Sequence, residues 1–276
     1  MKRIVSSKIV SALCALGVVS VLCFFLTTCA TVPLTERKSL SLIPDSELLS
    51  LSNQQYTQTL KESRLSNDQD KVQAVTRVGK RIAAAAEDFL QEKKAADKIK
   101  NYKWEYTVID DSKTANAWCM PGGKMAVYTG IFPYTRNDAG LAVVLGHEVA
   151  HAIAEHGNER MSQALIAQLG GAALSVALAK EPGETRDLYL AAYGVTANVG
   201  VLLPYSRTHE SEADRIGLTL MAKAGYDPHE AIRFWQQMSQ QGGSRPPTFL
   251  STHPAPESRI ENIKTYIPEA MHYYKK

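Results

Sequence analysis

The apolar residues of this chain recur mostly at helical spacing. A helix is predicted to begin at Asp45, which can cap it, and to run through Leu60. A second is predicted from about Asp70 to Lys94, where apolar residues recur every three or four positions, at Val72, Val75, Val78, Ile82 and Phe89. Further helices are predicted over about 137–156, 205–224 and 228–241, and at the start of the tail 255–276.

Two short stretches follow a period of two instead. Residues 102–110 alternate, with Tyr102, Trp104, Tyr106 and Val108 on one face, and predict a strand. Residues 124–129 predict a second strand, preceded by a turn at 121–123. A helix-rich chain with a small sheet is typical of an α+β domain.

Residues 164–179 are strongly apolar and resemble a membrane helix. The stretch is short for a bilayer and contains Gln168, Gly170 and Gly171, so a buried or hairpin-forming helix is the preferred interpretation.

The N-terminus has the pattern of an export signal. Lys2, Arg3 and Lys8 precede an apolar run over 9–26, which could alternatively remain as a membrane anchor. The sequence Leu-Thr-Thr before Cys29 resembles a bacterial lipobox, in which Cys29 would be lipidated. We therefore expect a signal peptide over 1–28, a tether over 29–44 and one domain over 45–276.

The net charge and the cysteine content limit the classes of partner and the cross-links that can be expected. The net charge of +3 equals the contribution of the three basic residues of the signal, so the remaining chain is close to neutral and gives no reason to expect nucleic acid as a partner. Of four cysteines, Cys119 alone lies after Cys29, so no internal disulfide is expected and Cys119 is interpreted as a small buried hydrophobe.

The chemistry centres on residues 147–151, which spell His-Glu-Val-Ala-His. On a helix, His147 and His151 share a face and can bind one metal ion, and Glu148 is placed to act on a bound water. An apolar run over 141–146 leads into the motif and predicts a buried helix, in which these groups need a partner such as zinc.

A catalytic zinc generally has three protein ligands. The segment 205–214 is the candidate source of the third, because His209, Glu210, Glu212 and Asp214 lie within six positions. Glu210 and Asp214 share a helical face, although a solvated acidic face would explain the cluster as well.

Together these motifs resemble metallopeptidase family M48, whose second motif is Glu-x-x-Ala-Asp, here 210–214. The resemblance extends from about residue 35 to 268 and implies a zincin-like (gluzincin) fold with a small sheet beside the active-site helix. It implies Glu210 as third ligand and Asp214 as the residue that steadies a ligand histidine. Residues 116–124 are similar to the strand and turn beside the family's cleft, and Thr252-His253-Pro254 with Arg259-Ile260 is similar to its C-terminal His-Pro signature.

This resemblance implies one Zn²⁺ per chain and Glu148 as general base toward a zinc-bound water. His253 is expected either to stabilise the oxyanion or to occupy the open zinc position and keep the enzyme latent, with Arg207 as a weaker oxyanion donor. The alternative is that His253 is a turn residue without a role in the site. An edge strand over 124–129 is expected to bind substrate backbone. The expected rim of the cleft comprises Asn116, Pro121, Gly122 and Gly123, although a plain tight turn explains the last three equally well.

With few apparent membrane spans, the chain looks like the small exported proteases of the bacterial envelope. We therefore expect a zinc endopeptidase on the periplasmic side, lipid-anchored to the outer membrane, that cleaves unfolded or misassembled envelope proteins in quality control. The alternative is a zinc-binding chaperone or assembly factor with little proteolysis.

Overall fold

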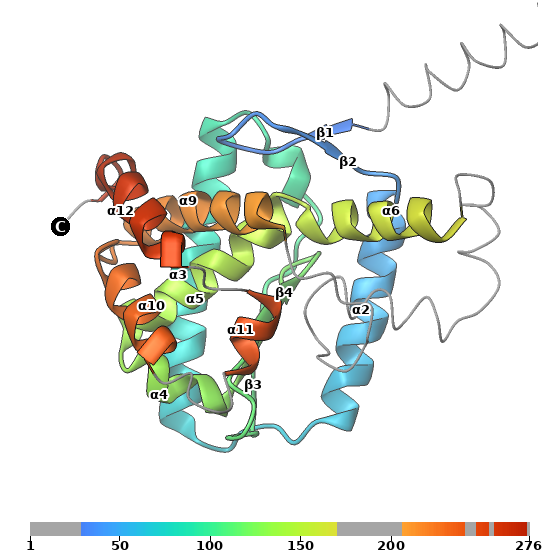
Figure 1. The fold of residues 1–276 in the computed structure, drawn as a ribbon. Coiled ribbons are helices and arrows are strands. Elements are labelled where there is room, and N and C mark those ends of the chain that lie inside the picture. The colour runs from blue at the N-terminus through green and yellow to red at the C-terminus, as the bar shows by residue number, and fades with distance from the viewer. Residues whose placement is uncertain (1–28, 170–205, 241–246, 254–256, 275–276) are drawn as a thin grey trace, which may run out of the picture.

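Two long helices cross the middle of the molecule and lie side by side (Figure 1). The computed structural model describes residues 29–169, 206–240, 247–253 and 257–274. Helix α5 (Asp138–Ile153) carries the first motif, and α9 (Arg207–Lys223) carries the second. Helices pack around this pair, and a three-stranded sheet lies against α5. The predicted α+β class is confirmed.

Helix α5 is buried on nearly every side, as its apolar run predicts. It begins where the Asn137 side chain accepts a hydrogen bond from the backbone N–H of Gly140, which satisfies one of the free donors of the first turn. The helix was predicted to continue to residue 156, but it ends at Ile153. Glu155 takes a left-handed backbone conformation, with φ of 59°, and a new helix, α6 (His156–Leu169), starts in a different direction.

The three-stranded sheet has the order β3-β5-β4. Strand β5 (Lys124–Tyr128) pairs in parallel with β3 (Glu105–Ile109) and antiparallel with β4 (Ala117–Met120). The prediction that 124–129 forms an edge strand is therefore wrong, because β5 lies between β3 and β4 and pairs with both. Of the two neighbours, β4 is the one that packs on α5.

Residues 29–44, expected to be a tether, are packed onto the body. They form a hairpin of β1 (Cys29–Thr31) and β2 (Lys38–Leu40) that lies along the upper side of the molecule in Figure 1. Val32 and Ile43 are buried in hydrophobic clusters, which explains why this segment is held in place.

The other helices follow the predictions closely: α2 (Asp45–Glu62), α3 (Gln69–Glu92), α10 (Glu230–Gln240) and α12 (Glu257–Met271). Four short elements were not predicted: η1 (Ala96–Ile99), η2 (Thr129–Ile131), α4 (Phe132–Thr135) and α11 (Thr248–Thr252). Across the part of the chain that is described, no helix combines the length and hydropathy that a bilayer crossing requires. The predicted signal over 1–28 and most of the apolar stretch 164–179 lie outside the described residues.

Candidate metal centre

Four side chains from three parts of the chain converge on one buried point. His147 and His151 come from α5, Glu210 from the first turn of α9, and His253 from the residue that ends α11. One donor atom from each lies within 4.8 Å of the other three, and all four residues are buried. The structure thus brings together the predicted ligand set and places His253 beside it, where one of its predicted roles requires it.

The spacing of these donors suits a tetrahedral zinc, whose ligand atoms lie about 3.3–3.6 Å apart when each is about 2.0–2.2 Å from the metal. The Nε2 atom of His147 lies 3.0 Å from Nε2 of His151 and 3.5 Å from Oε2 of Glu210. Nδ1 of His253 lies 3.2 Å from the same atom of His147 and 3.0 Å from Oε1 of Glu210. Three imidazoles and a carboxylate are donors that zinc accepts, so the residues present fit this ion.

Asp214 and Arg259 lie behind these donors. Oδ1 of Asp214 is 3.0 Å from Nδ1 of His147, as the resemblance implied. Arg259 donates to both carboxylate oxygens of Asp214, at 2.7 and 2.8 Å, and its Nη1 is 2.7 Å from Oε2 of Glu210. Its guanidinium also stacks 3.6 Å from the ring centre of Trp235. The C-terminal signature includes Arg259, but the sequence does not predict that Arg259 orients Asp214 and Glu210.

Burial and charge act in opposite directions on the two glutamates of the site. Burial raises the pKa of Glu148, although His253 and His147 oppose this. Burial alone would also raise the pKa of Glu210, but His253 and Arg259 outweigh it and hold that pKa well below its ordinary value. Glu210 is therefore a permanent carboxylate, as a ligand should be, whereas Glu148 has the raised pKa that suits a general base.

The other nitrogen of His151 faces His156, which a continuous helix over 137–156 would place on the side away from the metal. Nδ1 of His156 lies 2.9 Å from Nδ1 of His151, and the His156 side chain is fully buried. The break at Glu155 explains the difference, because a continuous helix would carry residue 156 past the ligand face.

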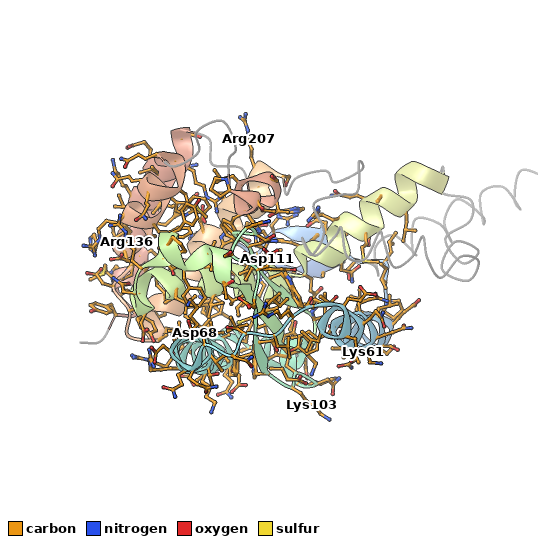
Figure 2. The ribbon with its side chains drawn as sticks, turned by 90° about the horizontal axis from the view of Figure 1, so that it is seen from below. Lys61, Asp68, Lys103, Asp111, Arg136 and Arg207 are labelled. Atoms are coloured by element: carbon orange, nitrogen blue, oxygen red, sulfur yellow. The ribbon has the colours of Figure 1, made fainter. Side chains whose placement is uncertain are left out.

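Two expectations about the site are not met. Arg207 is exposed and extends from the surface of the molecule (Figure 2), because it lies at the solvent-facing start of α9. Pro121, Gly122 and Gly123 are buried in the turn between β4 and β5 and do not form an exposed rim. Both glycines have positive φ, and a Cβ at Gly123 would lie 2.7 Å from the Trp104 ring, so a tight packed turn accounts for them.

Asn116 is buried just before β4, and its carbonyl accepts the backbone N–H of Tyr128 at 3.0 Å. It therefore helps to align β4 with the end of β5. Cys119 in β4 is also buried, and burial raises the pKa of its thiol well above the ordinary value. This agrees with the interpretation of Cys119 as a small hydrophobe.

Comparison with known proteins supports the chemistry of this centre. A family model described as Peptidase family M48 matches residues 73–267. The chain belongs to this family. Relatives in this family are named metalloendopeptidases, the class of enzyme that the sequence predicts.

Among relatives in family M48, the mitochondrial metalloendopeptidase OMA1 of Schizosaccharomyces pombe is 37% identical over 203 residues, covering 71% of this chain and 53% of the relative. The human mitochondrial metalloendopeptidase OMA1 is 32% identical over 259 residues, covering 90% of this chain and 48% of the relative. A putative beta-barrel assembly-enhancing protease of Vibrio cholerae is 34% identical over 170 residues, covering 56% and 34%. The chain thus spans about half the length of the OMA1 relatives.

These relatives correct the expected location. The periplasmic side of a bacterial envelope is contradicted, because the relatives from fungi, animals and plants that align with 63–90% of this chain are mitochondrial proteins. The narrower assignment to a small exported bacterial branch is not established either. The location rested on the export pattern of the N-terminal residues and the branch on the small number of apparent membrane spans, and neither feature specifies which membrane.

Proposed function

We propose that this protein is a zinc-dependent endopeptidase that degrades unfolded or misassembled proteins at a membrane surface. One observation carries the proposal: His147, His151, Glu210 and His253 form a buried donor cluster, and Glu148 lies beside it. A buried cluster of this kind is costly without a cation, and a general base next to it has no use in a purely structural site.

His147, His151 and Glu210 would hold the zinc, which when bound supplies a Lewis acid and an acidified water. Asp214 fixes the orientation of the His147 ring through Nδ1, which leaves Nε2 directed at the donor cluster. Arg259 balances the charge of Glu210 and Asp214. Glu148 would accept a proton during attack on the peptide and return it to the leaving amine, which its raised pKa favours.

His253 would close the site in the resting enzyme. Its Nδ1 takes the fourth donor position, and its Nε2 lies 3.3 Å from the carboxylate of Glu148. Both positions have to be vacated before a peptide carbonyl can reach the centre. The role as oxyanion donor would apply only after His253 has moved.

The substrate class rests on the relatives. One is named a beta-barrel assembly-enhancing protease and others are named metalloendopeptidases, which supports cleavage of whole proteins during assembly or quality control. An extended segment of such a substrate could pair with β4, the strand of the sheet that packs on α5. The apolar N-terminal run would keep the enzyme at the membrane.

The proposal is tested with Glu148→Gln. This variant should bind one zinc per chain, as the wild type does, and should lose cleavage of an unfolded protein. Glu269→Gln is the matched control, because Glu269 pairs with Arg215 in a partly exposed ion pair away from the donor cluster. If Glu148→Gln cleaves the unfolded protein at the wild-type rate, the mechanism is refuted. A wild-type protein that binds zinc and unfolded protein without cleaving it would favour the alternative, a chaperone.

A further inference from the structure

The two ligand histidines of α5 have different supports. Nδ1 of His147 faces a carboxylate of the same core, Asp214. Nδ1 of His151 instead faces a second histidine, His156, whose Nε2 lies 3.2 Å from Oε2 of Glu212. His156 and Glu212 are both buried, so solvent does not supply these contacts.

The positions of the protons in the series of contacts from His151 through His156 to Glu212 follow from the two residues at its ends. A His151 that binds zinc through Nε2 carries its proton on Nδ1 and must donate it to Nδ1 of His156. His156 then carries its own proton on Nε2 and donates it to Glu212. An ionised Glu212 thus fixes the tautomer of His156, and His156 fixes that of His151.

Glu212 is held by the N-terminal hairpin. Nε of Arg37 donates to Oε2 of Glu212 at 2.8 Å, and the hydroxyl of Thr35 donates to Oε1 at 2.5 Å. The same Arg37 donates to both oxygens of Glu159, at 2.9 and 2.7 Å, which ties the hairpin to α6. Glu212 is therefore paired with a guanidinium and a hydroxyl donor, which is the environment of an ionised carboxylate.

A strained turn brings His156 to this position. Glu155 has a φ of 59°, a left-handed conformation that is unfavourable for a non-glycine residue. Its carboxylate pairs with Lys98 of η1, which helps to hold the turn. Strain at a residue four positions after a candidate ligand is typical of segments that position functional groups.

We propose that Arg37, Glu212 and His156 are positioning residues for His151, so that the hairpin of residues 29–40 is a working part of the metal centre. This inference rests on the proposed zinc site. It makes zinc binding depend on a segment far from the ligand motifs in sequence, directly after the apolar N-terminal run. Displacement of the hairpin would weaken the site without touching a ligand.

The test measures zinc affinity by competition with a chromogenic chelator, in the full chain, for wild type, His156→Ala, Glu212→Gln and Arg37→Gln. We expect each variant to bind zinc about 10–100-fold more weakly, the range for loss of a group that supports a ligand. Arg37→Lys should recover part of the loss because it keeps the charge. Glu269→Gln should match wild type, since it removes a carboxylate from a different part of the fold.

The Arg37 side chain is 25% exposed, so Arg37→Gln tests the inference even if a buried variant does not fold. Thermal unfolding of the zinc-free proteins checks folding independently of the metal. If the folded variants bind zinc with the same affinity as the wild type, this inference is overturned and the proposed function is not affected. A wild-type chain that binds no zinc would overturn the proposed function as well.

Discussion

Nε2 of His253 lies 3.3 Å from Oε1 of Glu148, so the candidate base is covered by a residue 105 positions later in the chain. The segment that carries His253 is held by two backbone bonds: Phe249 N–H donates to the carbonyl of Ala115, and His253 N–H donates to that of Phe249. Opening the site therefore requires α11 to move or His253 to change rotamer.

His253→Ala should raise proteolysis of an unfolded protein. If His253 occupies the fourth donor position nine-tenths of the time, its removal increases the rate of proteolysis about tenfold. Initial rates at saturating zinc measure this, with zinc content as the control for site integrity. A fall on the order of a hundredfold would instead assign His253 to the oxyanion. Unchanged rates would leave it as a residue of the turn.

Glu210→Ala and Glu212→Ala should separate a ligand from its support. Glu210 contributes a donor atom to the cluster, so its removal should abolish stoichiometric zinc in dialysed protein. Glu212 contacts His156 and contributes no donor atom to the cluster of described residues, so its variant should still bind zinc at high concentration, with lower affinity. Elemental analysis and chelator competition together distinguish the two. The reverse pattern would show that the third ligand has been misassigned.

Removal of Arg259 should destabilise the zinc-free protein strongly. Its side chain is buried between Glu210 and Asp214, so Arg259→Gln leaves two carboxylates without their cation. Loss of one partner of a buried ion pair costs about 3–5 kcal/mol, and urea unfolding in the presence of EDTA measures it. Arg215→Gln, which breaks a partly exposed pair with Glu269, should cost less than about 1 kcal/mol. Equal effects would argue against a charge-balancing role for Arg259.

Acid should weaken the attachment of the hairpin to α6. Burial raises the pKa of Glu159, but His209 and Arg37 outweigh it and lower that pKa from 4.5 to about 2. Because the folded-state value is depressed, this stabilisation is complete above pH 4.5 and is lost as the pH falls toward 2. Each pH unit in that window removes up to about 1.4 kcal/mol. The urea concentration at which half of the zinc-free protein is unfolded should therefore decrease as the pH is lowered below 4.5. The decrease should be less steep in Glu159→Gln.

The sequence predicts the parts of this structure that repeat or that lie close together in the chain. Helical spacing identifies α3 and α5 to within a few residues, and the i, i+4 rule places His147 and His151 together. It does not predict the break at Glu155, because nothing in that residue type requires a positive φ. It therefore misplaces His156.

Contacts between distant segments are the other gap. Arg37 meets Glu212 across 175 positions and Glu159 across 122, and no local pattern encodes either pairing. The strand order is hidden for the same reason: residues 124–129 have the alternation of a strand whether they lie at an edge or in the centre.

Helices α5 and α9 meet at two glycines. A Cβ on Gly146 would lie 2.9 Å from the carbonyl oxygen of Gly217, and one on Gly217 would lie 3.0 Å from the backbone nitrogen of His147. A methyl group at either position would push apart the helices that carry His147 and Glu210. A homologue could thus retain every donor of the site and still be unable to bring them within reach of one ion. An inventory of ligand motifs would count such a chain among active peptidases, and only the residues at the crossing would reveal that it is not one.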